Sequence, residues 1–315
     1  MPEWLIERGI GETRAALVEG GAIVEARILL DGSMRAGTML EARLKQAAAP
    51  AIALADGVEY LLPAGAPGTT QGAPLRIEVT REAIPGAEPW KRPLARATDE
   101  PVTSAALLDG RPVAFPSPAP NPLDDAGWDD LVDQARSGMV DFAGGALRIS
   151  PTPAMTLIDV DGTLPPAELA VAGAAAAAKA IRRLDIGGSI GIDLPTVPGK
   201  LSRQAAAVAI DAHLSPPFER TAVNGFGFVQ IVRPRLRPSL LEIWSDRAAA
   251  EARALLRRAA LAGSGPRRLA AHPAVIAVLE RNADWLETLA RQLGGAISLH
   301  SDPALAMSAG HAEPA

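Results

Sequence analysis

The fold of this chain is decided by the stretch Met155-Thr156-Leu157-Ile158-Asp159-Val160-Asp161-Gly162-Thr163. An apolar run leads into two carboxylates and then a glycine. Residues two apart on a β-strand point to the same face of the sheet, so Asp159 and Asp161 are expected to project together. Gly162 would let the backbone turn sharply after them. The simplest alternative is that these are ordinary strand-end aspartates that cap a turn or a helix.

A second apolar strand, Ile190-Gly191-Ile192-Asp193, also ends in an acid. Residues 167–183 between the two strands predict a helix, with Pro165-Pro166 at its start. A strand–helix–strand unit makes the two strands parallel neighbours. Their carboxyl ends then share one edge, where ligands bind in open α/β sheets. Asp159 and Asp193 would meet there, and three carboxylates at such an edge suit a hard divalent cation.

The composition excludes several classes of protein. The 315 residues allow two domains, or one domain with an insertion, and 48% of them are hydrophobic but only 3% aromatic. A net charge of −5 argues against binding nucleic acid through bulk charge, although a local basic groove stays compatible with it. Without cysteine there can be no disulfide and no thiolate zinc site, which suits a reducing cytosol. No signal peptide and no membrane span are expected, so we predict a cytoplasmic protein.

The first hundred residues predict β structure. Residues 3–31 resemble two or three strands, and residues 37–96 form short strands separated by glycine- and proline-rich turns. The second group predicts a small five-stranded barrel. A barrel that binds nucleic acid would need stacking aromatics, and the sequence offers Tyr60, with Trp90 just beyond. The basic cluster that begins at Lys91 either contacts phosphate or is a solvated linker.

The remaining elements alternate between helices and strands. A proline-rich connector is expected over 97–127, and a hairpin around Gly144-Gly145. Arg233, Arg235 and Arg237 occupy alternate positions of an extended segment, which predicts either a row of phosphate contacts or an exposed edge-strand face. The other predicted elements are helices at 124–137, 202–213, 246–260, 273–281 and 285–293, a loop at 263–268, strands at 228–232 and 296–300, and disorder after 302.

Several of these motifs resemble the catalytic core of the ribonuclease E/G family. The resemblance is carried, in order, by residues 155–161, by Arg183-Leu184-Asp185-Ile186-Gly187-Gly188 with the strand to Asp193, and by Phe226-Gly227-Phe228 with the segment to Leu240. Looser similarity extends to Glu12-Thr13-Arg14 and to the segment from His272 to Gly295.

The resemblance implies an endoribonuclease that cuts single-stranded RNA with Mg²⁺, for which Mn²⁺ is an alternative. Asp159 and Asp193 match the two aspartates that hold the metal in the family. Asp161 stands where the family has asparagine, and this third carboxylate could ligate the metal directly or through water. Arg233 and Arg235, with Lys200, Arg203 and Lys91, would hold the RNA backbone.

The resemblance also implies a division into subdomains. An RNase H-like subdomain is expected to be split between 1–35 and 105–150, and a DNase I-like catalytic subdomain to span 151–242. The expected remainder comprises a reduced S1-like barrel at 36–96, a linker at 97–104, a C-terminal small α/β domain at 243–302 and a disordered tail at 303–315.

The chain departs from the family pattern at several points. The family's two-cysteine zinc link is absent after Leu240, so a zinc-bridged oligomer is excluded, and a homodimer would have to form without it. Ile52 and Leu54 stand where the barrel's aromatic platform is expected. No counterpart of the 5′-monophosphate sensor fits before residue 105, and the family's arginine before Phe-Gly is Gly225.

Three functions are compatible with these features. The first is a reduced endoribonuclease of RNA processing or decay. The second is a non-catalytic RNA-binding or ribosome-associated protein that keeps the fold, although a pure binder gains nothing from clustered acids facing phosphate. The third is a metal-dependent hydrolase of a small phosphorylated molecule, which the absence of a glycine-rich phosphate loop next to a lysine disfavours.

Overall fold

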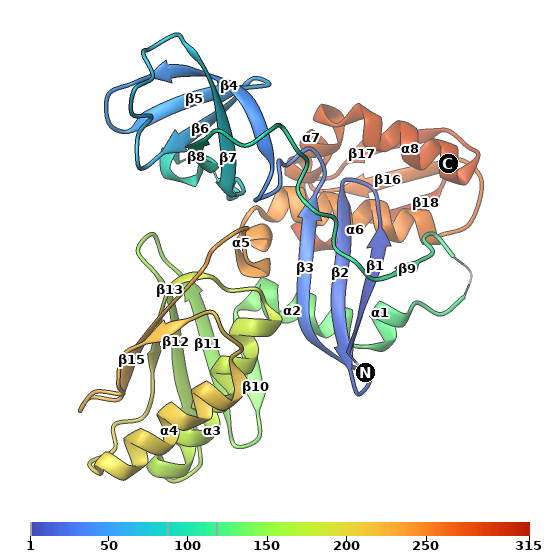
Figure 1. Ribbon diagram of the computed structural model, residues 1–315. Helices are drawn as coiled ribbons and strands as arrows, with labels where there is room; N and C mark the ends of the chain where they lie inside the picture. Colours follow the sequence, from blue (N-terminus) through green and yellow to red (C-terminus); the bar gives the residue numbers. More distant parts are fainter. Residues whose placement is uncertain (1, 87, 118) are drawn as a thin grey trace. The chain divides into compact units, whose positions relative to one another are not determined.

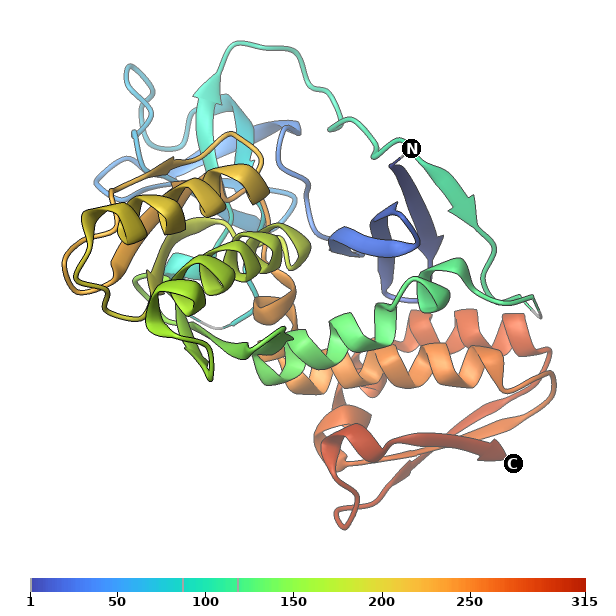
Figure 2. The same cartoon turned by 90° about the horizontal axis from the view of Figure 1, so that it is seen from below.

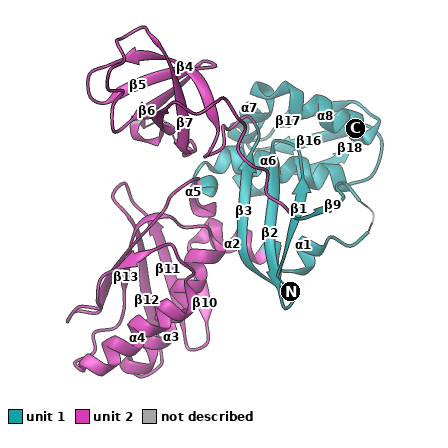
Figure 3. Ribbon diagram, in the orientation of Figure 1, with its two compact units in different colours: residues 1–31, 110–129, 243–315 teal, residues 32–109, 130–242 magenta. Residues whose placement is uncertain are grey.

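The computed structural model describes residues 2–86, 88–117 and 119–315, and its chain divides into two compact units (Figure 1, Figure 3). The first unit comprises residues 1–31, 110–129 and 243–315, and the second comprises 32–109 and 130–242. The fold is mixed α/β and includes a closed five-stranded barrel, which confirms the predicted class and the predicted barrel.

The first unit contains two small sheets. The N-terminal sheet has the order β3-β2-β1-β9, in which β9 runs parallel to β1, and the C-terminal sheet has the order β17-β16-β18. Asp246 caps the start of α6, because its Oδ1 accepts a hydrogen bond from the amide of Ala249 at 3.2 Å. The bounds are β1 Glu3–Arg8, β2 Glu12–Glu19, β3 Ala22–Leu30, β9 Arg111–Val113, α1 Pro122–Asp125, α6 Arg247–Leu261, β16 Arg267–Ala271, α7 Pro273–Arg281, α8 Ala283–Leu293, β17 Ile297–Ser301, η2 Met307–Ala309 and β18 His311–Pro314.

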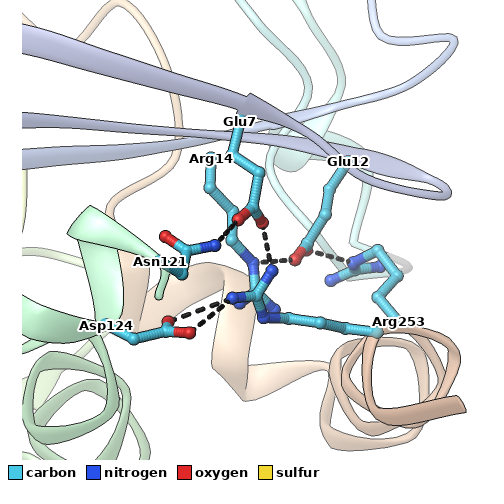
Figure 4. A network of polar contacts seen from close by, with 7 residues as sticks. Glu7, Glu12, Arg14, Asn121, Asp124 and Arg253 are labelled. Carbon is cyan, nitrogen blue, oxygen red and sulfur yellow. Dashed lines mark hydrogen bonds and ion pairs between the residues drawn. The ribbon is translucent and has the colours of Figure 1, made fainter. Parts of the chain in front are cut away.

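A buried carboxylate ties the N-terminal sheet to α6 (Figure 4). Glu12 accepts hydrogen bonds from Nε of Arg14 at 2.8 Å and from Nε of Arg253 at 2.9 Å. Burial alone would raise the pKa of the Glu12 carboxyl, but the charges and hydrogen bonds of the two arginines hold it below its ordinary value. Arg14 also lies over the ring of the fully buried Trp128, 5.4 Å from its centroid.

A second buried carboxylate lies in the same unit. Glu7, which is 1% exposed, accepts hydrogen bonds from Arg257 and from Asn121. Arg257 extends the contact to Asp124, with Nη2 2.9 Å from Oδ2, and stacks over Phe115. Glu7 and Glu12 therefore each have an opposite charge beside them, as the burial of a charge requires.

The barrel has the strand order β4-β5-β6-β8-β7 and an interior of small and aliphatic side chains. Tyr60 lies inside it and is 1% exposed, so its ring is not available for stacking on a base. The bounds are β4 Met39–Gln46, β5 Ala51–Ala55, β6 Val58–Leu62, β7 Pro74–Arg81, η1 Pro89–Lys91 and β8 Leu94–Thr98. Residues 97 and 98, predicted to be linker, therefore belong to the last barrel strand.

The rest of the second unit is a six-stranded sheet of order β10-β11-β12-β13-β15-β14. The predicted hairpin and the predicted parallel pairing of the two acid-ending strands are both confirmed. The bounds are β10 Met139–Phe142, β11 Gly145–Pro151, β12 Thr156–Gly162, α3 Pro166–Arg183, β13 Gly188–Asp193, α4 Lys200–His213, β14 Glu219–Arg220 and β15 Phe228–Arg233.

Two helices, α3 and α4, pack side by side on one face of this sheet (Figure 1, Figure 2). The residues beneath them alternate with outward-facing ones; Ile158, Ile190 and Ile192 are each at most 1% exposed. Gly173 lets α3 approach β12, because a Cβ there would overlap Cγ1 of Val160. Within the described part of the chain, no helix combines the length and apolarity needed to cross a membrane.

Four sequence predictions need correction. The tail after residue 302 is not disordered, since β18 pairs antiparallel with β16. The predicted helix 124–137 is broken at Gly127, whose φ of 96° interrupts it, into α1 and α2 (Trp128–Ser137). The predicted loop 263–268 ends earlier, because β16 begins at Arg267. The helix α5, Leu240–Ser245, was not predicted.

Candidate functional site

The two aspartates predicted to hold a metal ion, Asp159 and Asp193, lie side by side on adjacent parallel strands. In the register of β12 and β13, the Cα of Asp159 is the partner of the Cα of Asp193. Neighbouring strands lie about 4.8 Å apart, so side chains at paired positions project together from the same face. Ile158 and Val160 turn inward, which leaves Asp159 and Asp193 exposed on the face opposite the helices. Two carboxylates so placed can reach one divalent cation.

Asp161 lies further along the same face. It is two residues beyond Asp159, about 7 Å along the strand, and its cross-strand partner is Ala146. Among residues 2–86, 88–117 and 119–315, no group of three or more acidic, histidine or cysteine side chains is close enough to hold one metal ion. The geometry therefore brings Asp159 and Asp193 together but does not bring Asp161 into the same ligand set.

Gly162 ends β12 for a different reason from the one predicted. A Cβ at this position would overlap the carbonyl oxygen of Gly144 in the neighbouring hairpin and would lie 2.7 Å from Cδ1 of Leu169. Close approach of the backbone, rather than a left-handed turn, requires glycine here. Glycine at this position thus lets the end of β12 lie close against the hairpin and α3.

The open face next to Asp193 is aromatic. Phe228 is the cross-strand partner of Asp193, and Gly191 lies on the same face. A Cβ on Gly191 would come within 2.6 Å of the Phe228 ring and 3.0 Å of Cδ2 of Leu157. The ring therefore lies across Gly191 and towards Leu157, which is 40% exposed.

The three alternate arginines each contact a partner inside the unit. Arg233 donates through Nη1 to the carbonyl of Ile186 at 3.1 Å, near the end of α3. Arg235 pairs with Glu242, and Nη1 of Arg237 lies 3.0 Å from Oδ2 of Asp185. Arg233 and Arg237 thus support the turn between α3 and β13, and Arg235 pairs with a residue of α5, so the three do not form the row of free cations that alternate spacing suggested. The RNA contacts predicted for Arg233 and Arg235 stay predictions.

The other predicted RNA-binding residues lie in different surroundings. Lys200 is exposed at the first position of α4, where the helix dipole disfavours a cation, so helix stability gives no reason for lysine there. Arg203 donates to the carbonyl of Val197 at 3.0 Å and fastens the loop that follows Asp193. Lys91 lies in η1 beside the barrel, with Nζ 3.1 Å from Oε2 of Glu88.

Sequence reasoning missed Arg148. Its Cα is the partner of the Cα of Asp159 on the antiparallel strand β11, and its side chain is exposed on the open face. The signal was the alternation of β11, in which Leu147 and Ile149 are buried while Arg148 faces outward. One row across the sheet therefore reads Arg148, Asp159, Asp193, Phe228.

This row combines a cation, two oxygen donors and an aromatic ring on one exposed surface. Such a surface can bind a divalent cation and a phosphate, and it can offer the ring to a flat apolar group. No protein-family model matches the chain, and a search of curated proteins finds no match either.

Proposed function

We propose that the open face of the six-stranded sheet cleaves single-stranded RNA with the help of a divalent metal ion. The observation that carries this proposal is that Asp159 and Asp193 occupy paired positions on two adjacent parallel strands and are both exposed. The resemblance of residues 155–161 and 183–193 to the ribonuclease E/G core supplies the substrate class. Exposed carboxylates are the donors that Mg²⁺ and Mn²⁺ prefer, so the residues present fit the metal.

Each side chain of the row has a role in this proposal. Asp159 and Asp193 hold the metal, and Asp161 orients a water at the edge of the site. When bound, the metal supplies Lewis-acid catalysis and makes a water more acidic. Arg148 contacts a non-bridging oxygen of the phosphodiester, since a guanidinium pairs well with phosphate. By the same resemblance, water adds to phosphorus and the bond to the 3′ oxygen breaks, leaving a 5′-phosphate and a 3′-hydroxyl.

The resemblance also supports an assignment of the subdomains. In this assignment residues 151–242, with β12, β13, α3 and α4, are the DNase I-like subdomain, and residues 36–96 are the S1-like domain. Residues 1–35 and 105–150 are the split RNase H-like subdomain, although β10 and β11 at the end of the second segment pair into the sheet of β12. We propose a cytoplasmic enzyme, and any homodimer would form without a zinc link.

A non-catalytic RNA-binding protein is the second candidate. The buried Tyr60 and the internal partners of Arg233, Arg235 and Arg237 weaken the expected grip on RNA, so they count against this candidate as much as against the first. Against it, a surface with Asp159 and Asp193 side by side repels phosphate unless a cation lies between them.

The deciding experiment is incubation of a labelled, unstructured RNA with the protein in Mg²⁺ and in EDTA. Substrates with a 5′-monophosphate and a 5′-triphosphate test dependence on the 5′ end. We expect cleavage in Mg²⁺ alone, and its loss in Asp193→Asn with an unchanged circular dichroism spectrum. Asp109→Asn, an exposed acid outside the sheet, serves as the control and should cleave normally. Full activity of Asp193→Asn would refute the assignment.

A further inference from the structure

The aromatic side chains of this chain are few, and the highly exposed Phe226 lies two residues before Phe228, the cross-strand partner of Asp193. The sequence contains five phenylalanines, five tryptophans and one tyrosine among 315 residues. Phe226 is 82% exposed, and Phe228 lies on the open face opposite Asp193. Single exposed apolar residues are common on protein surfaces, so exposure alone does not indicate a binding site. The rigid backbone that holds Phe226 in its exposed position does indicate one.

The backbone of Phe226 is fixed from several sides. Oδ1 of Asn224 accepts hydrogen bonds from the amides of Phe226 at 2.9 Å and Phe228 at 3.0 Å. Oγ1 of Thr196, in the loop after Asp193, donates to the carbonyl of Phe226 at 3.0 Å. Gly227 has φ of 94°, and a Cβ there would overlap the carbonyl oxygen of Leu194, which excludes other residues. The turn thus presents an exposed ring without backbone freedom.

The position of this ring relative to the acids is also limited. Phe228 is directly opposite Asp193, and their Cα atoms form a cross-strand pair about 5 Å apart. Phe226 is two residues earlier, so its Cα lies within about 7 Å of that of Phe228. Phe226 and Phe228 therefore lie next to the place where Asp159 and Asp193 would hold the metal ion.

We propose that Phe226 and Phe228 form a nucleobase-stacking subsite beside Asp193; this rests on the proposed function. A base next to a phosphate bound at the metal has the flat π-face that these rings accept, whatever the identity of the base. The barrel cannot supply this surface through Tyr60, which is buried. A protein partner would require a broader apolar patch, and the neighbours of Phe226 in the turn are Asn224 and Gly225.

The positions of Arg148 and of the two rings define the path of a bound RNA strand across the sheet. Arg148 lies on one side of the acidic pair and the aromatic rings lie on the other. A strand that contacts both crosses the sheet roughly perpendicular to β12 and β13. Stacking would then order the nucleotide adjacent to the cleaved bond, so one base position near that bond should matter more than the others.

The test uses the full chain and a series of unstructured RNAs, each with one abasic ribose. For the wild type we expect kcat/KM in Mg²⁺ to fall by about 5- to 100-fold when the abasic position is next to the cleaved bond. Phe226→Leu should lose a similar factor on intact RNA and should no longer respond to that abasic position, because the two changes remove the same contact. Phe226→Trp should keep the response. Leu107→Ala, at an equally exposed apolar position, is the matched control and should behave as wild type.

The outcomes separate this inference from the proposed function. If the wild type cleaves and Phe226→Leu is as sensitive to the abasic position as the wild type, the subsite is refuted while the nuclease stands. If the wild type does not cleave, the nuclease is refuted, and anisotropy of the same labelled RNAs then decides the subsite. Weaker binding by Phe226→Leu, together with loss of the abasic response, would support it. Equal binding by both proteins would refute it.

Discussion

Nε of Arg253 in α6 donates a hydrogen bond to Oε2 of Glu12 in β2 at 2.9 Å, across 241 residues of sequence. Both side chains are buried. Removing one partner of a buried ion pair leaves an uncompensated charge and typically costs about 3–5 kcal/mol. We therefore expect Glu12→Gln to lower the free energy of unfolding of the first unit by about that amount, measured by urea denaturation. Glu313→Gln, which removes an exposed ion pair with Arg268, is the control and should change stability little.

The same pair predicts an acid-sensitive contribution to stability. Burial would raise the pKa of Glu12, but Arg14 and Arg253 lower it below its ordinary value of 4.5. A lowered carboxyl pKa contributes stability that is fully present above about pH 4.5 and is lost as the pH falls through the folded-state pKa. The difference in unfolding free energy between wild type and Glu12→Gln should therefore shrink below pH 4. A difference that stays constant from pH 7 to pH 3 would contradict this account.

Glu82, at the end of the barrel strand β7, predicts the opposite slope. Burial raises the pKa of Glu82 above 4.5, and Arg35 and Arg237 only partly oppose the shift. A raised carboxyl pKa means that the ionised form is costly in the folded state, and that this cost disappears as the pH falls through the folded-state pKa. From pH 7 to pH 4.5, wild type should gain stability relative to Glu82→Gln. Parallel pH profiles of the two proteins would show that the prediction is wrong.

Gly173 is expected to be intolerant of a side chain. Alanine favours the helix over glycine by about 1 kcal/mol, but its Cβ would overlap the stiff, buried side chain of Val160. Overpacking of this kind costs about 1–3 kcal/mol, so Gly173→Ala should lower the melting temperature in spite of its propensity. Gly225→Ala, where a Cβ would meet nothing within 4 Å, should leave the melting temperature unchanged.

The separation of Asp161 from the paired aspartates predicts graded effects on RNA cleavage. Asp159→Asn should abolish cleavage, because it removes one of the two paired ligands. Asp161→Ala should reduce cleavage by about 10- to 100-fold, the usual effect of losing a group that acts through water. A Mg²⁺ titration at fixed RNA measures both variants. Equal loss in the two would instead show that all three carboxylates bind the metal directly.

Arg148 and Arg235 should respond differently to neutralisation. Arg148 is exposed beside Asp159, so Arg148→Gln should raise KM by about 10- to 100-fold through loss of a charged hydrogen bond, with the melting temperature unchanged. Arg235→Gln removes the cation paired with Glu242 and should lower the melting temperature. Unaltered kinetics in Arg148→Gln would remove it from the proposed site.

Local patterns were enough to predict the elements that form the site. Alternation in residues 156–161 and 189–193, with an alanine-rich helix between them, predicts parallel strands and the side-by-side aspartates. Arg148 was not predicted because its relevance depends on the register of β11 against β12, which the sequence of β11 alone does not specify. The internal partners of Arg233, Arg235 and Arg237 were missed for a similar reason, since Asp185 and Glu242 lie in other elements.

The C-terminal elements show the limits of composition. Residues 303–315 contain alanine, glycine and proline and have little hydrophobic alternation, which is why disorder was predicted. The strand β18 forms because β16 offers an unpaired edge, where backbone hydrogen bonds suffice without apolar side chains. Likewise, the break between α1 and α2 depends on the positive φ of Gly127, which glycine permits but does not require.

The assembly of the first unit from residues 1–31, 110–129 and 243–315 has a consequence for biosynthesis. On the ribosome, β1 to β3 leave the exit tunnel long before α6 and β16 have been translated. Glu7 and Glu12 therefore stay solvated until Arg257 and Arg253 have been synthesised and can pair with them. The second unit, by contrast, has all its residues by position 242. The nascent chain can therefore complete its second unit before its first, reversing the usual N-to-C order of domain maturation.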